Sequence, residues 1–160
     1  LHMKLLVFSD SHGDVSHMEQ AVLAEAPDRI VHLGDMVRDA QRLAKRFPDL
    51  PLDYVYGNCD GCYSGPGTEQ VLTVENFRIL MMHGHTRGVK GGLERAVLAA
   101  QEAEAHAVLF GHTHRPLCDR AGALWVLNPG SCRGPLFWTY GILTIQEGQL
   151  RCRTVRGDAV

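Results

Sequence analysis

The sequence lacks any apolar run long enough to cross a membrane. Its longest uninterrupted apolar stretches, such as Leu5 to Phe8, have about a quarter of the ~18 residues that a membrane helix or a signal segment needs. No single sign of charge dominates either, because 16 basic side chains stand against 18 acidic ones and the net charge is −2. These absences argue against a membrane partner and against nucleic-acid binding through bulk charge, and we expect a cytoplasmic protein.

The cysteines do not form a recognisable disulfide framework. Their number, five, is odd, and a 160-residue chain that is 45% hydrophobic buries enough surface, roughly 70%, to be stable without cross-links. We therefore expect reduced thiols and a single domain over residues 1–160. Leu1 and His2 precede Met3, and we expect them to be additions ahead of the natural start.

Alternation of apolar stretches with turn residues predicts an α/β domain. Ser16 and Glu19 have the spacing of a capping box, which predicts a helix that starts at Ser16 and stops before Pro27. Other helices are predicted over 39–46 and 93–104. Strands are predicted over 5–8, 29–33, 52–56, 71–74, 77–82, 108–110, 117–120, 124–127, 140–145 and 150–155.

Side chains that can bind metals follow five of the predicted strands. They are Asp10 and His12, Asp35, Asn58, His83, and His112 and His114. In open α/β sheets the ligand site lies outside the carboxyl ends of the strands, so we expect these residues to converge. Asp10-x-His12 and His112-x-His114 would each present two donors to one side, because alternate residues of an extended segment share a face.

Seven donors are more than one ion needs. If one carboxylate is shared, they supply four ligands to each of two cations about 3.5 to 4 Å apart. The set mixes carboxylate, amide oxygen and imidazole without thiolate, which favours Mn, Fe, Co, Ni or Zn over Ca or Mg. Of the remaining histidines, His32 lies in an apolar strand and is expected to be a hydrogen-bonded core residue, and His17 and His106 are given no site role.

The motifs that carry these residues resemble the calcineurin-like metallophosphoesterase superfamily, and most closely its small bacterial and archaeal phosphodiesterase branch. The matching blocks are Asp10-Ser11-His12, Gly34-Asp35, Gly57-Asn58-Cys59-Asp60, His83-Gly84-His85 and Gly111-His112-Thr113-His114. The resemblance implies a four-layer α/β/β/α sandwich of two mixed sheets flanked by helices. It also implies a first metal held by Asp10, His12, Asp35 and His114 and a second held by Asp35, Asn58, His83 and His112, with Asp35 as the bridge.

The implied activity is that of a metal-dependent phosphodiesterase acting on small phosphate esters, in which a hydroxide bridging two transition-metal ions, Mn first among them, attacks phosphorus in line. Asp35, Asn58 and His85 are the catalytic candidates. His85 is placed either on a phosphate oxygen or leaving group, or behind a metal ligand that it orients. Many family members carry histidine where this chain has Cys59, and a thiol is a poorer acid for the leaving group.

Several other interpretations stay open. The same fold can act as a phosphomonoesterase or as a noncatalytic protein-binding scaffold. Cys59 and Cys62 form a C-x-x-C pair typical of thiol redox proteins. Phe137, Trp138 and Tyr140 could form an exposed contact patch, or they could pack in the core or at a homo-oligomer interface. Asn128 to Ser131 is either a plain turn or a loop that presents groups near the metals.

Overall fold

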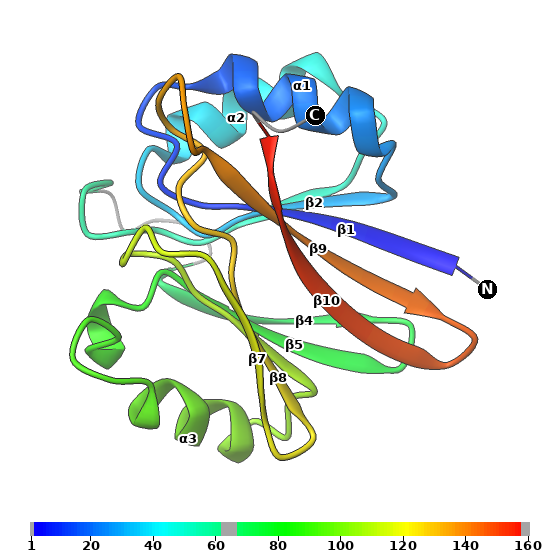
Figure 1. Cartoon of the computed structure of the whole chain (residues 1–160), viewed down its shortest axis with the longest axis vertical. Coiled ribbons are helices and arrows are strands. Elements are labelled where there is room, and N and C mark those ends of the chain that lie inside the picture. Colours follow the sequence, from blue (N-terminus) through cyan, green and yellow to red (C-terminus); the bar gives the residue numbers. More distant parts are fainter. Residues whose placement is uncertain (1, 62–66, 158–160) are drawn as a thin grey trace.

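Two five-stranded sheets lie face to face in the computed structural model, which describes residues 2–61 and 67–157 (Figure 1). The first sheet has the order β10 (Gln149–Arg156), β9 (Thr139–Gln146), β1 (His2–Phe8), β2 (Arg29–His32), β3 (Leu52–Tyr54). The second has the order β4 (Glu69–Val74), β5 (Phe77–Met82), β6 (Ala107–Leu109), β8 (Leu124–Asn128), β7 (Leu117–Ala121).

Helices cover the outer face of each sheet. In Figure 1, α1 (Val15–Glu25) and α2 (Val37–Arg46) lie on the first sheet, and α3 (Glu94–Glu102) lies on the second. A short 3₁₀ helix, η1 (His85–Arg87), follows β5. The predicted four-layer α/β/β/α sandwich is therefore confirmed, and both sheets are mixed, because each has three parallel strands extended by antiparallel ones.

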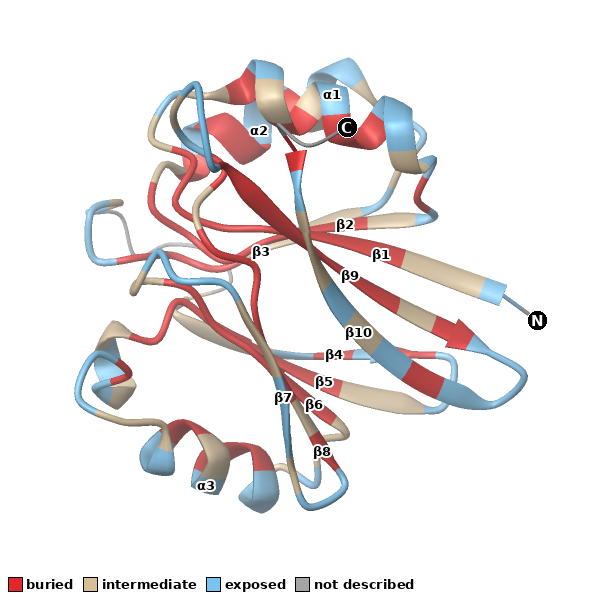
Figure 2. Cartoon of the chain, viewed as in Figure 1, coloured by how far each residue is buried: buried red, intermediate tan, exposed pale blue. Residues whose placement is uncertain are grey.

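The central strands are apolar on both faces because the middle of each sheet is covered on both sides. In β1, Leu5 and Val7 point into the core between the sheets, whereas Leu6 and Phe8 point toward the helices. This follows from the two-residue repeat of a strand. Figure 2 shows the result as continuous buried stretches along the central strands.

The predicted start of α1 is wrong. The helix begins at Val15, and Ser16 is an exposed residue within it. Glu19 does not close a capping box but forms an ion pair of 3.3 Å with Arg46 of α2. Asp14, which precedes the helix, accepts a hydrogen bond from the Gly134 N–H at 2.7 Å. Arg46 of α2 and Gly134 of the loop between β8 and β9 therefore bind the side chains that a local cap would use.

Other boundaries differ by a few residues. β1 extends back to His2, which pairs with Gln146 of β9, and β3 ends at Tyr54 rather than at residue 56. α2 begins at Val37, two residues before the predicted start, and α3 ends at Glu102, two residues before the predicted end. Within the described residues, no helix combines the length and apolar character that a membrane span requires.

The core between the sheets predicts a large cost for truncating its side chains. Leu109→Ala, in the fully buried β6, should lower the free energy of unfolding by about 2–5 kcal/mol through lost contacts and a residual cavity. Leu98→Ala is the matched control, because Leu98 is 54% exposed on α3, and its effect should stay within about 0.5 kcal/mol. Urea denaturation of both variants measures the difference. Equal losses would contradict this description of the core.

Candidate metal centre

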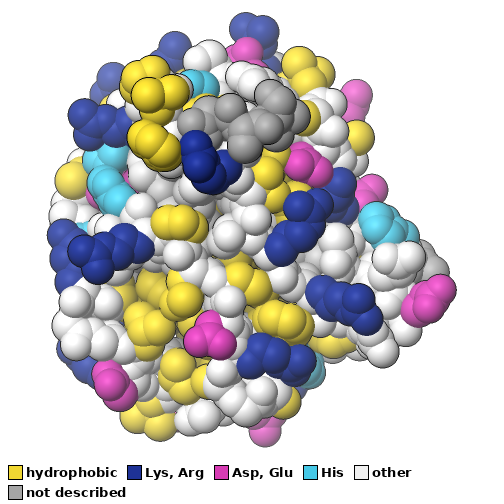
Figure 3. Space-filling model, in the orientation of Figure 1, with side chains coloured by type: hydrophobic (Ala, Val, Ile, Leu, Met, Phe, Trp, Pro, Cys, Tyr) yellow, Lys and Arg dark blue, Asp and Glu magenta, His cyan; other side chains and the backbone are white. Residues whose placement is uncertain are grey.

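The predicted ligands lie where strands of both sheets end. The parallel strands β1 and β2 of the first sheet, and β5 and β6 of the second, send their following loops to the same end of the sandwich, on the left in Figure 1. Figure 3 shows histidine side chains reaching the surface on that side, beside several lysine and arginine side chains. Side chains from positions 10 to 114 are thereby brought together.

Asp10 is the centre of the cluster. Its Oδ1 lies 3.2 Å from His114 Nε2, 3.8 Å from His83 Nε2 and 3.9 Å from His12 Nε2. Asp35 adds a second carboxylate, whose Oδ2 lies 3.5 Å from His83 Nε2 and 3.8 Å from His12 Nε2. Two groups of three ligand atoms result, Asp10–His12–His114 and Asp10–Asp35–His83, and the atoms of each lie within 4.8 Å of one another.

Asp10, Asp35 and His83 each use one side-chain atom for a hydrogen bond within the protein, which leaves a second atom available to a cation. Asp10 Oδ2 accepts hydrogen bonds from Ser9 Oγ at 2.5 Å and from the His112 N–H at 3.0 Å. Asp35 Oδ1 accepts one from the Cys59 N–H at 3.0 Å. His83 Nδ1 lies 3.0 Å from the Leu33 carbonyl oxygen and so carries the proton, which leaves the lone pair on Nε2. This is the usual arrangement behind a metal-bound imidazole.

Buried atoms without hydrogen-bond partners show that the cluster fits a cation. Asp10 Oδ1, His12 Nε2 and His83 Nε2 are buried and have no partner within the described chain. Asp10 and His83 have no exposed surface at all, and Asp35 is 3% exposed. Leaving such groups unmatched is costly, and a divalent metal would satisfy all of them at once. Carboxylate oxygen and imidazole nitrogen without thiolate suit a transition metal.

The backbone at the ligands is strained. Five of the seven predicted ligands have a positive φ, in the left-handed region that non-glycine residues rarely adopt: Asp10 (55°), His12 (44°), Asp35 (58°), His112 (70°) and His114 (62°). Each such residue costs of order 1–3 kcal/mol and persists where the surroundings enforce it. The expectation that the paired ligands occupy extended segments is therefore wrong, although Asp10 and His12 still meet.

Two glycines allow the loops to approach closely. A Cβ on Gly34, whose φ is 104°, would lie 2.5 Å from the Gly57 nitrogen. A Cβ on Gly57 would collide with the Asp35 carboxylate. The loops after β2 and β3 are therefore in backbone contact beside Asp35, and a side chain at either position would push them apart.

Three further predicted site residues lie in loops next to this centre. The ring of His112 lies 5.0 Å from that of His83 and 6.1 Å from that of His85. The His85 ring lies 5.3 Å from that of His83, and its buried Nδ1 has no partner among the described residues. Asn58 is exposed on the loop between Gly57 and Cys59, both of which contact Asp35.

Charge and burial set the protonation of the site. Burial raises the pKa of Asp35, but the field of His83 and the hydrogen bond from the Cys59 N–H outweigh it, so the pKa lies below its ordinary value. Burial, followed by the field of His83, lowers the pKa of both His85 and His112. At neutral pH Asp35 is thus ionised and the two imidazoles are neutral, the forms that bind metals.

Asp60 holds two of the loops together. Its carboxylate accepts four backbone hydrogen bonds, from the N–H groups of Asp35 (2.9 Å), Met36 (2.8 Å), Val37 (2.8 Å) and Gly57 (2.7 Å). Two of these groups, Met36 and Val37, are the N-cap and the first residue of α2, so Asp60 caps that helix from a separate loop. It acts by fixing the backbone of Asp35.

A buried chain of hydrogen bonds lies behind the ligand loops. Most of its members were not predicted from the sequence. The Gly34 N–H donates to His32 Nδ1 at 3.1 Å, which places the His32 proton on Nε2, 2.9 Å from Ser11 Oγ. Ser11 Oγ in turn donates to Asp39 Oδ2 at 2.8 Å. His32 is the hydrogen-bonded core histidine that was expected, but only the folded chain reveals that Ser11 and Asp39 complete the network.

The segment from Asn128 to Ser131 leads out of β8 and braces the ligand loops. The Gly130 N–H donates to Asn128 Oδ1 at 2.8 Å, and Asn128 Nδ2 donates to Thr113 Oγ1 at 2.9 Å. Ser131 Oγ donates to the Asp10 carbonyl oxygen at 2.8 Å. These contacts position the backbone on both sides of the centre.

The environment of Cys59 does not favour thiol redox chemistry at the C-x-x-C pair. Burial, and then the charge of Asp35, raise the pKa of Cys59, whereas a redox-active thiol of this type needs a lowered pKa. Cys62 lies outside the described residues.

Comparison with known proteins identifies the class. Residues 3–148 match the calcineurin-like phosphoesterase superfamily domain. The chain is 34% identical over 152 residues to a probable metallophosphoesterase of Bacillus subtilis, YsnB, covering 91% of this chain and 86% of that one. It is 26% identical over 169 residues to a phosphodiesterase of Methanocaldococcus jannaschii, and the match covers 93% of this chain and 97% of that one.

Solved structures agree on the fold. A conserved uncharacterized protein from Streptococcus pneumoniae has a TM-score of 0.81 at 28% identity, covering 99% of this chain and 91% of that one. Vps29 of Entamoeba histolytica complexed with zinc has a TM-score of 0.72 at 20% identity, covering 97% and 99%, and shares the fold. The chain therefore belongs to the calcineurin-like phosphoesterase superfamily and is a metal-dependent phosphoesterase.

The buried His32 makes stability depend on pH. Burial, opposed by Asp39, lowers its pKa from 6.5 to about 4. The unfolded chain therefore binds this proton first, so the contribution of His32 is complete above pH 6.5 and is lost as the pH falls toward about 4, a change of about 3 kcal/mol. His32→Asn should remove this part of the pH dependence in urea denaturation. His106→Asn is the control, because His106 Nδ1 also accepts a backbone N–H, from Arg78, but the ring is only half-buried. An unchanged slope in His32→Asn would contradict the assignment.

Proposed function

We propose that this chain is a dinuclear phosphodiesterase and that residues 1–160 form one domain. Asp10, His12, Asp35 and His114 would hold one metal, and Asp35, Asn58, His83 and His112 the other. The observation that carries the proposal is the set of buried ligand atoms without partners, Asp10 Oδ1, His12 Nε2 and His83 Nε2, facing one another and Asp35. Family membership gives the reaction class.

Two bound transition-metal ions, Mn before Ni, Co, Fe or Zn, would supply a water acidified toward a pKa of ~7 and positive charge for the phosphate oxygens. The protein itself contributes ligand atoms that are held in fixed positions. Asp10, Asp35 and His83 are each held by hydrogen bonds through an atom that does not face the cluster, so their ligand atoms need no reorganisation.

His85 is the side chain assigned to the substrate. Its half-buried ring lies beside His83 and His112, its lowered pKa keeps it neutral, and its Nδ1 has no partner among the described residues. In this position it orients a phosphate oxygen or assists the leaving group. Cys59 keeps its proton at neutral pH because its pKa is raised, but a thiol so reluctant to ionise is a weak acid, so esters with good leaving groups should react fastest.

A pocket beside the ligand loop favours diesters. Its volume is about 570 Å³, and it is lined by Thr113 and Arg115, which flank His114, and by Lys90 and Phe110. The positive charge of Lys90 acts on His112, so the pocket and the centre are neighbours. A diester has a second substituent that can occupy such a pocket, whereas a monoester has none. Localisation in the cytoplasm and a homo-oligomeric state stay predictions.

The proposal predicts metal-restored hydrolysis of a simple diester. Chelator-stripped protein should hydrolyse bis-p-nitrophenyl phosphate when Mn, Ni, Co or Zn is added back, and p-nitrophenyl phosphate more slowly. Asp35→Asn removes the shared charge and should abolish this turnover. Asp49→Asn, at an exposed position between α2 and β3, is the matched control and should keep it. A preference for the monoester would favour a phosphomonoesterase, and no turnover with any metal would favour a noncatalytic scaffold.

A second variant separates substrate contact from metal binding. His85→Asn should lower kcat by about 100-fold or more, as removal of a proton-transfer group does, while the metal content stays unchanged. Steady-state kinetics and metal analysis of the same preparation test this. Loss of bound metal would instead make His85 a ligand.

A further inference from the structure

Two cysteines from different sheets meet at one edge of the sandwich. Cys118 lies in β7, the last strand of the second sheet, and Cys152 lies in β10, the first strand of the other. Their Sγ atoms are 3.0 Å apart, and Cys118 Sγ donates to the Cys152 carbonyl oxygen at 3.1 Å. Both side chains are half-buried against the core between the sheets.

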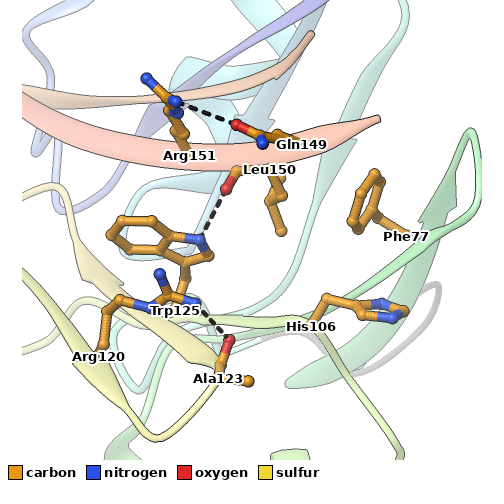
Figure 4. Close-up of a pocket in the computed structure, with 8 residues that line it drawn as sticks. All are labelled: Phe77, His106, Arg120, Ala123, Trp125, Gln149, Leu150 and Arg151. Carbon is orange, nitrogen blue, oxygen red and sulfur yellow. Dashed lines mark hydrogen bonds between the residues drawn. The ribbon is translucent and has the colours of Figure 1, made fainter. Parts of the chain in front are cut away.

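A second contact joins the same two sheets close to the cysteines. Trp125 of β8 donates its indole N–H to the Leu150 carbonyl oxygen of β10 at 2.8 Å, and Figure 4 shows this bond crossing from one sheet to the other. Arg120, the β7 partner of Trp125, lies 4.4 Å over its ring. Because Leu150 and Arg120 are each two residues from the cysteines, this contact limits how far the two sulfurs can move apart.

We propose that Cys118 and Cys152 form a reversible disulfide that joins the open edges of the two sheets. An S–S bond is about 2.03–2.05 Å long, so the sulfurs need to approach by only about 1 Å. The other described cysteines have different surroundings: Cys132 is fully buried, and Cys59 lies beside Asp35.

The oxidant is a low-molecular-weight disulfide. One protein thiolate attacks a sulfur of the oxidant, which forms a mixed disulfide and releases one small thiol. The second cysteine, after losing its proton, then displaces the other small thiol. Two protein S–H groups are thereby oxidised to one S–S bond, and the oxidant is reduced to two thiols.

The surroundings of Cys118 and Cys152 favour a disulfide that stabilises the fold over one that takes part in catalysis. Burial, followed by the hydrogen bond with Cys118, raises the pKa of Cys152, although Arg120 opposes this. The thiolate is therefore scarce at neutral pH, and oxidation should be slow. The bond would close a loop of about 35 residues, and restricting the unfolded chain in this way stabilises the fold.

Oxidation of the full chain with glutathione disulfide tests the proposal. Peptide mapping without reduction should recover a peptide pair linked through Cys118 and Cys152, and the Tm should rise by about 10 °C and fall again on reduction. Cys118→Ser and Cys152→Ser should each lose the link and the rise. Cys132→Ser should keep both.

Two results would overturn the proposal. One is that Cys118 and Cys152 stay free after prolonged oxidation, and the other is that each carries its own glutathione. The mapping reports the bond directly, so the result does not depend on how stable the serine variants are.

Discussion

The arrangement of the loops depends on one buried carboxylate. Asp10 has no exposed surface, and its two oxygens have different environments: Oδ2 is hydrogen-bonded to Ser9 and to the backbone of His112, whereas Oδ1 faces three imidazole nitrogens. Burying a carboxylate oxygen without a hydrogen-bond donor requires compensation, which a bound cation would provide. Loops from both sheets place imidazole side chains around Asp10. The fold thereby positions the groups that the metal-dependent chemistry of the superfamily needs.

Meeting that requirement strains the chain, and the rest of the structure compensates. Five predicted ligands have left-handed backbone conformations, and Gly34 and Gly57 are in backbone contact next to Asp35. Asp60 binds four backbone N–H groups across this junction, and the His32–Ser11–Asp39 chain ties the loops after β1 and β2 together. Rigid support of this kind holds the ligand atoms in fixed positions, at a cost that the three hydrophobic cores offset.

Much of the fold could be predicted from the sequence because its signals are local. Apolar runs, turn residues and the clear period of the helices gave nearly all the elements, and donors placed after strand ends indicated a shared site. What could not be predicted depends on tertiary contacts: the use of Asp14 and Glu19 outside a capping box, the buried chain through Ser11 and Asp39, and the meeting of Cys118 with Cys152. The conformation of the ligands was also missed, because the left-handed backbone at Asp10 and His12 has no sequence signal comparable to glycine.

Anomalous diffraction from crystals grown with Mn²⁺ would show whether two cations share this centre. We expect two anomalous peaks per chain, one beside Asp10, His12 and His114 and one beside His83 and His112, with Asp35 contacting both. A single peak would contradict the dinuclear centre. Peaks away from these residues, or none, would contradict the assignment of Asp10 as the carboxylate around which the loops are built.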